Sequence, residues 1–242
     1  MAAISARLRD LLARGRRVAA LTGAGISAES GVPTFRSQGG FWENESLLDL
    51  ATPQGFDRDP GRVWAWYDGR RRQIKGCSPN AGHRALERFG RAHPEFRLIT
   101  QNVDGLHHAA GSASVILLHG DLFRVRCMKE GTSREDRRVP LPEIPPRCGC
   151  GALLRPDVVW FGEALPEEAM RDATEAARRS EVFLSIGTSA LVYPAAALPE
   201  VAKQNGAYLV EINIEETPLS PVADEVILGP AAEVLPDLLG AG

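Results

Sequence analysis

Two short segments of the sequence, one rich in glycine and one polar, hold residue types that could do chemistry, and each follows an apolar run. Gly23-Ala24-Gly25 comes directly after residues 18–22, and a strand that runs into a Gly-x-Gly turn lets backbone amides approach a nucleotide pyrophosphate. Gln101, Asn102 and Asp104 follow a second apolar run, so their side chains would point together into the crevice at the strand end. The alternative for these three is an ordinary polar turn, because Asn and Asp are common in turns.

Any of the five histidines could serve as a general base, and His119 is the one that directly follows an apolar run. Histidine titrates near pH 6.5, which suits proton transfer at neutral pH, and His119 stands between the apolar run 115–118 and a glycine. A single histidine is more often structural than catalytic, and a structural role is expected for His107 and His108, which follow the polar segment.

The order of apolar runs predicts the elements that must position these residues. An amphipathic helix is expected over 4–15, and a last helix over 231–239. The expected strands are 18–22, 96–100, 115–118, 182–186, 208–212 and 225–228. The pattern predicts an α/β fold with a doubly wound, Rossmann-like parallel sheet that binds its ligand at the carboxyl edge.

Two long segments interrupt this alternation. Residues 37–95 separate the first two strands by far more than a crossover helix needs, which indicates a mainly helical insertion. Residues 121–157 hold three cysteines, many prolines and no long periodic run, which indicates a small module held by a metal. We therefore expect a large Rossmann-like domain from 1–36, 96–120 and 158–242, and a small composite domain from the two insertions.

The composition is that of an ordinary globular protein. Of the 242 residues, 44% are hydrophobic and 24% are charged, which excludes a disordered tail protein. The 28 basic and 31 acidic residues give a net charge of −3, so no direct nucleic-acid partner is expected. The sequence shows no signal peptide and no apolar run that would span a membrane, so we expect a cytoplasmic protein.

Three of the four cysteines are candidate metal ligands. Cys148 and Cys150 form a close pair, with Cys127 upstream, a grouping typical of a metal site in a reducing compartment rather than of a disulfide framework. Cys77 stands apart in a turn segment and is expected to be structural.

The residues after the glycine-rich turn argue against a simple dehydrogenase. Such an enzyme places an acidic residue about 20 positions on, at the end of a second strand, whereas residues 41–45 have no strand before them. Longer strings of residues indicate a protein family more specifically than the glycine-rich turn alone. In chain order they are GAGISAESGVPTFR (23–36), TQNVDGLH (100–107), HG (119–120), LLRPDVVWFGE (153–163), GTSALVYPAA (187–196) and VEIN (210–213). With these strings the sequence resembles the sirtuins, which are NAD-dependent protein lysine deacylases, over roughly residues 4–239.

The resemblance implies an NAD site assembled from the strand ends. The amides of the glycine-rich turn and the guanidinium of Arg36 would hold the diphosphate, and Phe35 would shield the nicotinamide ribose from water. Asp104 would bind the nicotinamide carboxamide, and Asn102 would order the ribose and a water. The further implied cofactor contacts are Gln101, Gly187, Thr188 and Ser189 for phosphate and ribose, Asn213 and Glu215 for the adenosine ribose, and Ala231 for the adenine.

The implied chemistry is transfer of an ADP-ribosyl group, with NAD consumed as a co-substrate. The amide oxygen of an acyl-lysine is a poor nucleophile, so the enzyme must hold it against the anomeric carbon of NAD as nicotinamide leaves. His119 then deprotonates a ribose hydroxyl, which attacks the resulting imidate, and water releases the lysine and an O-acyl-ADP-ribose. The substrates would be acylated-lysine proteins or peptides that pair as a strand with residues 155–163, with Val159 and Phe161 near the lysine.

Ala51, Tyr67 and Arg70 indicate which acyl groups the site would accept. Tyr67 and Arg70 are three residues apart and share one helix face, and a phenol with a guanidinium can bind a carboxylate. Ala51 is small where a bulkier residue would fill the pocket. These residues resemble the class III sirtuins, which remove succinyl, malonyl and glutaryl groups. The alternative is a half-buried Tyr67 beside a solvated face of arginines.

The cysteine module departs from the sirtuin pattern of two close cysteine pairs. Glu130 stands where the partner of Cys127 is expected, and Cys148 and Cys150 are one residue closer together than usual. The three thiolates with Glu130 could hold zinc, since carboxylates also ligate it. The alternative is a module that has lost its metal.

Two other functions remain open beside deacylation. A mono-ADP-ribosyltransferase would use the same NAD site with a protein nucleophile, and a non-catalytic NAD-sensing module would only bind NAD. The presence of His119, Asn102 and Asp104 favours a catalyst. The sequence leaves the oligomeric state open.

Overall fold

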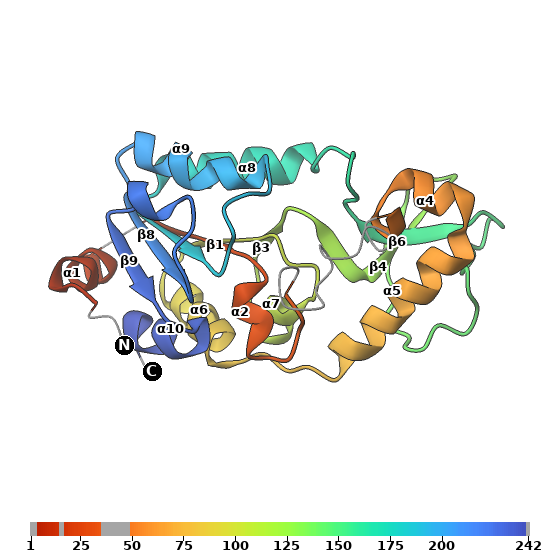
Figure 1. Cartoon of the computed structure of the whole chain (residues 1–242), viewed down its shortest axis with the longest axis horizontal. Helices are drawn as coiled ribbons and strands as arrows, with labels where there is room; N and C mark the ends of the chain where they lie inside the picture. The colour runs from red at the N-terminus through yellow and green to blue at the C-terminus, as the bar shows by residue number, and fades with distance from the viewer. Residues whose placement is uncertain (1–3, 15–16, 35–48, 241–242) are drawn as a thin grey trace.

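The computed structural model describes residues 4–14, 17–34 and 49–240. Figure 1 shows two lobes of unequal size, a large one around a sheet with helices on both faces and a small one around the long helix α5 (Pro60–Lys75). Among the helices of these residues, none is long and apolar enough to cross a membrane.

A six-stranded parallel sheet forms the centre of the large lobe. Its spatial order, β3-β2-β1-β7-β8-β9, is that of a doubly wound, Rossmann-like fold, so the predicted fold class is confirmed. The observed strands differ from the predicted ones by at most one residue at an end. They are β1 (Val18–Thr22), β2 (Arg97–Thr100), β3 (Val115–Leu117), β7 (Val182–Ile186), β8 (Tyr208–Asn213) and β9 (Glu225–Leu228).

Helices cover both faces of this sheet (Figure 1). Side chains alternate between the faces along a strand, so Val18 and Ala20 belong to one apolar cluster while Ala19 and Leu21 belong to another. Burial on both faces explains why β1 and β7 are buried along their whole length. The helices are α8 (Glu167–Arg179) and α9 (Leu198–Gln204) on one face, and α1 (Ala6–Arg14), α6 (Ala81–Ala92) and α10 (Ala231–Leu239) on the other.

In the small lobe, residues from both sides of the second strand of the parallel sheet pack around one shared core. A three-stranded antiparallel sheet of order β5-β4-β6 packs against the helices, and the sequence did not predict these strands. The indole of Trp64 is fully buried and its Nε1 donates to the Leu154 carbonyl (2.7 Å), which joins α5 to this sheet. The elements are 3₁₀ helix η2 (Asp49–Ala51), α4 (Pro53–Arg58), α5, β4 (Gly120–Cys127), β5 (Ser133–Glu135) and β6 (Leu154–Val158).

Helix α6 corrects the predicted extent of the helical insertion. It falls within residues 37–95, yet Ala85, Leu86 and Phe89 pack in the same core as the parallel sheet and α10. By its packing α6 is therefore the crossover helix that leads into β2, and the part of the insertion that belongs to the small lobe ends before it.

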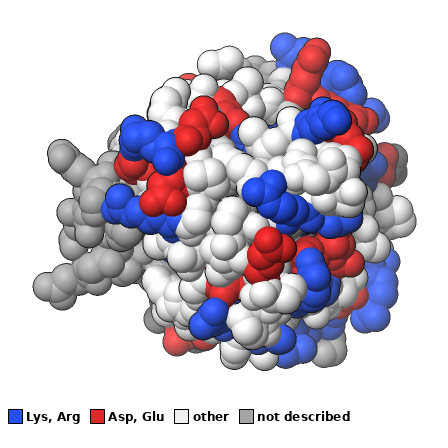
Figure 2. Space-filling view, turned by 90° about the vertical axis from the view of Figure 1, so that its right-hand side faces the viewer, with Lys and Arg blue, Asp and Glu red and all other residues white. Residues whose placement is uncertain are grey.

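Charges of both signs are mixed on the end of the molecule formed by the small lobe. Figure 2 shows basic and acidic side chains interspersed there, and exposed ion pairs of the small lobe join Arg58 to Asp49 and Arg137 to Glu135. On the described part of this face no continuous basic stripe is visible.

Candidate active site

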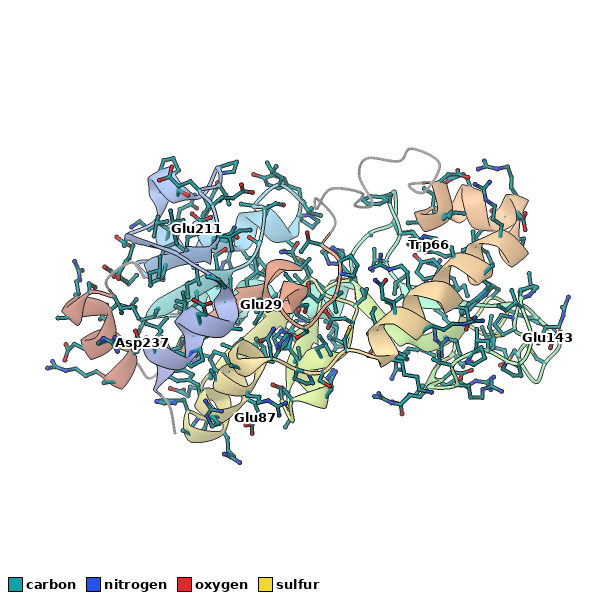
Figure 3. All side chains as sticks on the ribbon, turned by 60° about the horizontal axis from the view of Figure 1, so that its bottom comes forward. Glu29, Trp66, Glu87, Glu143, Glu211 and Asp237 are labelled. Atoms are coloured by element: carbon teal, nitrogen blue, oxygen red, sulfur yellow. The ribbon has the colours of Figure 1, made fainter. Side chains whose placement is uncertain are left out.

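A cavity of about 560 Å³ lies where the two lobes meet, at the carboxyl ends of the parallel strands. Strand order reverses between β1 and β7, and doubly wound folds bind ligands at this reversal. Glu29 lines the cavity from the large lobe and Trp66 from the small lobe, and both are labelled in Figure 3. The predicted site residues that line it are Gly23, Ala24, Gly25, Ala51, Tyr67, Arg70, Gln101, Asn102, His119, Val159, Phe161, Gly187, Thr188, Ser189, Asn213, Glu215 and Ala231.

Among the predicted site residues that the structure describes, Asp104 and the three cysteines do not line this cavity. Asp104 lies behind it, and the cysteines Cys127, Cys148 and Cys150 lie in the small lobe. Phe35 and Arg36, predicted to contact NAD, lie outside the described residues.

Two turns are in close contact at the strand reversal, and their glycines carry no side chains that would cover the backbone. Gly25 follows β1 at the start of the short helix α2 (Gly25–Ala28), and its N–H donates to the carbonyl of Gly187 (2.9 Å), which follows β7. A Cβ on Gly25 would lie 2.6 Å from the Cα of Gly187, and a Cβ on Gly23 would lie 2.7 Å from its carbonyl oxygen. Gly187 has a φ of +58°, which strains any other residue. Such a bare backbone next to a helix start fits a diphosphate.

A buried polar network supports the glycine-rich turn from behind. Asn102 Nδ2 donates to the Gly23 carbonyl (3.0 Å) and to Ser27 Oγ (3.3 Å), and Ser27 Oγ donates to Asp104 Oδ2 (2.7 Å). The other oxygen of Asp104 accepts from the backbone N–H of Leu106 (2.9 Å). Burial raises the pKa of Asp104 above its usual value. The two oxygens of Asp104 thus face Ser27 and the start of α7 (Leu106–Ala109), while Asn102 reaches the cavity.

His119 stands between β3 and β4 with a defined tautomer. Its Nδ1 lies 3.2 Å from the carbonyl oxygen of Gln101; because a carbonyl only accepts, Nδ1 carries the proton of the neutral ring and Nε2 has the free lone pair. Burial lowers the pKa of His119 below 6.5, so the ring is neutral at pH 7. A neutral imidazole that lines the cavity with a free lone pair can accept a proton from a ligand.

Tyr67, Arg70 and Ala51 all line the small-lobe side of the cavity. Tyr67 is only 4% exposed, and its hydroxyl accepts a hydrogen bond from Trp160 Nε1 (2.9 Å). The guanidinium of Arg70 lies 5.4 Å from the centre of the Trp66 ring. Burial raises the pKa of Tyr67 and lowers that of Arg70, yet both ordinary values lie so far above 7 that the phenol stays protonated and the guanidinium charged.

The far end of the cavity is formed by the loop after β8. Asn213 Nδ2 donates to the Thr188 carbonyl (2.8 Å), which links this loop to the turn after β7. Glu211, labelled in Figure 3, is only 1% exposed and accepts hydrogen bonds from the hydroxyls of Thr217 and Ser220. These bonds hold the loop in a shape that places Glu215 and Thr217 on the cavity wall.

Sequence analysis did not single out Ser27, Trp160 or Glu211. Each acts through a contact with a residue that the fold brings near, and only Glu211 left a signal, as a charged residue within an otherwise apolar strand. A charge at a buried position of a strand requires partners.

The four donor atoms of Cys127, Glu130, Cys148 and Cys150 lie within 4.8 Å of one another. The Sγ atoms of Cys127 and Cys150 are 3.6 Å apart, and Glu130 Oε2 is 3.8 Å from Cys148 Sγ. Thiolate ligands of a tetrahedral zinc lie about 3.8 Å apart. The backbone N–H of Glu130 points at Cys127 Sγ (3.4 Å), which favours a thiolate. The donor set and its spacing therefore fit zinc. None of these four residues lines the cavity.

Comparisons with known proteins agree with this arrangement. Residues 23–194 match the model of the Sir2 family. The NAD-dependent protein deacylase of Aquifex aeolicus is 54% identical over 208 residues, which cover 86% of this chain and 87% of the relative. A solved Sir2 homologue in complex with NAD is 45% identical, with a TM-score of 0.92, and covers 98% of this chain and 93% of its own. A solved Sir2 complex with a p53 peptide and NAD is 31% identical, with a TM-score of 0.87 and 98% of both chains covered. The chain therefore belongs to the Sir2 family, and the resemblance to the sirtuins is confirmed.

Proposed function

We propose that this protein is an NAD-dependent protein lysine deacylase that removes acetyl groups and also the dicarboxylic succinyl and malonyl groups. The deacylase activity is supported by the family and by relatives that carry this name. The preference for dicarboxylic groups is supported by one observation in particular: Tyr67 and Arg70 line the same cavity as His119.

The large lobe supplies the part of the site that suits NAD. Bound NAD supplies an anomeric carbon from which nicotinamide can leave. The bare turns at Gly25 and Gly187 would receive its diphosphate, and Asn213 with Glu215 would hold the adenosine ribose. His119, with its lone pair on Nε2, would take the proton of a ribose hydroxyl once the acyl oxygen has reacted. Ala231 at the start of α10 would lie against the adenine.

Residues 159–161 connect the base to the acyl pocket. The N–H of Val159 donates to the carbonyl of His119 (2.9 Å), and the N–H of Phe161 donates to the carbonyl of Ala51 (2.9 Å). Phe161 is 40% exposed at the cavity mouth. A substrate strand laid along this segment would place its acyl-lysine between His119 and the Tyr67–Arg70 pair.

The two donors suit a carboxylate at the end of the acyl chain. The Arg70 guanidinium can form two parallel hydrogen bonds with it, and the Tyr67 hydroxyl can donate a third. Ala51 leaves room for the longer chain, since its side chain ends at Cβ. An acetyl group would occupy the same channel without reaching these donors.

The test is to follow NAD-dependent loss of acyl groups from acyl-lysine peptides by mass spectrometry, with His119→Ala as the inactive control. The proposal predicts nicotinamide and an O-acyl-ADP-ribose in amounts equal to the lysine released. ADP-ribose that remains on protein would instead support a mono-ADP-ribosyltransferase. Binding of NAD without either product would support a sensing module.

A further inference from the structure

The hydroxyl of Tyr67 is oriented by a side chain from a different part of the chain. Trp160 is 2% exposed, and its indole N–H points at the Tyr67 oxygen from 2.9 Å. An indole nitrogen can only donate, so Tyr67 must accept this bond. The phenolic proton prefers the plane of its ring, where it has two positions, and the Trp160 N–H occupies the direction of one of them. The proton of Tyr67 is therefore directed away from Trp160.

The described residues provide no acceptor for that proton. The bond from Trp160 is the one hydrogen bond recorded for the Tyr67 hydroxyl among them, and Tyr67 lines the cavity. The rings of Tyr67 and Trp66 pack in an edge-to-face arrangement, with 4.6 Å between the ring centres. The Tyr67 O–H is thus a buried donor that a ligand in the cavity can satisfy.

The indole that directs Tyr67 is itself packed between two other side chains, Arg155 and Phe56. The guanidinium carbon of Arg155 lies 3.5 Å from the centre of the Trp160 ring, and the Phe56 ring lies 5.3 Å away on a tilted plane. Arg155 forms a two-pronged ion pair with Glu163 (2.6 and 2.7 Å), and Glu163 also accepts from the backbone N–H of Trp160 (2.8 Å). Arg155 is only 5% exposed, and its ion pair with Glu163 joins the two ends of the 155–163 segment.

We propose that Trp160 is a specificity-determining residue that acts through Tyr67. By donating to the phenol it fixes Tyr67 as a donor toward the cavity, so that the end of the acyl channel presents two donors, the Tyr67 O–H and the Arg70 guanidinium. Such an end selects acyl chains that finish in a carboxylate and rejects apolar chains of the same length. This inference rests on the proposed deacylase function.

The selection follows from the cost of leaving the buried Tyr67 donor unpaired. A pentanoyl chain has the length of a succinyl chain but ends in a methyl group, so it would remove water from the Tyr67 O–H without replacing its hydrogen bond. A buried site built to hydrogen-bond a substrate group discriminates strongly against an analogue that lacks the group. Without the indole N–H, the phenolic proton can turn to either position and the discrimination weakens.

The test compares succinyl-lysine and pentanoyl-lysine peptides of the same sequence with the wild-type enzyme and Trp160→Phe. We expect the KM for the succinyl peptide to rise about tenfold, which is the weight of one ordinary hydrogen bond, while the KM for the pentanoyl peptide changes far less. In a Tyr67→Phe background, adding Trp160→Phe should leave the ratio of the two KM values where Tyr67→Phe alone puts it, because the hydroxyl on which Trp160 acts is gone.

A second replacement separates the hydrogen bond from the packing of the ring. Benzothienylalanine at position 160 keeps the ring volume and replaces the N–H by sulfur, and it should reproduce the effect of Trp160→Phe even if the smaller ring unfolds the protein. Equal losses for both peptides, or effects of Trp160→Phe and Tyr67→Phe that simply add, would overturn the role of Trp160. If the wild type binds NAD and removes acetyl groups but not succinyl groups, the carboxylate pocket itself is wrong, and the role of Trp160 falls with it.

Discussion

The ring of His119 and the backbone carbonyl of Gln101 are joined by a hydrogen bond of 3.2 Å, which fixes the tautomer of the candidate base. The bond comes from the strand geometry, because Gln101 follows β2 and His119 follows the neighbouring β3. The polar residues at these two strand ends therefore meet although 18 positions separate them in the chain.

The first prediction concerns the pH dependence of the reaction. Burial lowers the pKa of His119 below 6.5, so the neutral, proton-accepting form persists to a lower pH than for an exposed histidine. We expect kcat/KM to rise as pH increases toward 6.5 and to be level from there to pH 8, and His119→Ala to lower kcat by roughly 10²- to 10⁴-fold. A kcat/KM profile measured from pH 5 to 8 checks this. An acid limb with an apparent pKa above 7 would assign the proton transfer to a different group.

The second prediction concerns the contact between the two glycine turns. Ala at position 25 would place its Cβ 2.6 Å from the Gly187 Cα, so one turn must shift and the NAD-binding backbone shifts with it. We expect Gly25→Ala to weaken NAD binding at least tenfold, as measured by isothermal titration calorimetry. Gly69→Ala is the matched control, because a Cβ there meets nothing within 4 Å and alanine favours the helix. Equal NAD affinity of the two variants would show that this contact is irrelevant to binding.

The third prediction concerns the ligand set of the cysteine cluster. We expect one zinc ion per chain by elemental analysis of protein purified without chelator, held by three thiolates and Glu130. Glu130→Ala removes a ligand and should weaken zinc binding by about 10- to 100-fold, whereas Glu130→Cys should strengthen it. The cobalt-substituted protein gives a second measurement, since its thiolate charge-transfer absorption should grow from wild type to Glu130→Cys. A zinc content near zero, or the same zinc affinity for Glu130→Ala as for wild type, contradicts this ligand set.

The fourth prediction concerns acid stability. His83 and His107 are buried with their ring centres 4.9 Å apart, and burial lowers their pKa to about 4 and about 3. Between these values and 6.5 the unfolded state binds more protons than the folded state, so the free energy of unfolding falls as the pH falls. Each histidine contributes up to about 1.4 kcal/mol per pH unit in this window.

The histidine contribution can be isolated with His107→Gln, whose side chain keeps a polar partner for Thr22 Oγ1 (2.9 Å from His107 Nε2). The free energy of unfolding, measured in urea at several pH values between 4.5 and 7, should depend less steeply on pH for the variant than for wild type. The same pH dependence for both proteins would mean that folding does not shift the pKa of His107.

The sequence was most informative about the large lobe. Central parallel strands are buried on both faces and read as continuous apolar runs, and β1 and β7 are buried at every position. The sequence therefore indicated where each of these strands begins and ends, and which polar residues follow it.

The small lobe was harder to predict because its burial depends on distant segments. Val125 and Leu154 of the cysteine module pack against Val63 and Trp64 of α5, so neither segment shows a core of its own. Strands β4, β5 and β6 were missed for this reason. The same holds for the contacts of Trp160 with Tyr67, 93 positions apart in the chain, which only the folded arrangement of the two segments creates.

The most direct test of the proposed function is a competition in a single tube. Equal amounts of an acetyl-lysine and a succinyl-lysine peptide of one sequence are incubated with the enzyme and NAD, and the loss of each is followed by mass spectrometry. The two donors at the end of the acyl channel predict that succinyl loss keeps pace with acetyl loss or exceeds it, and that Arg70→Met shifts the ratio toward acetyl at least tenfold. Loss of acetyl alone by the wild type would contradict the carboxylate pocket, and loss of neither peptide would contradict the deacylase function.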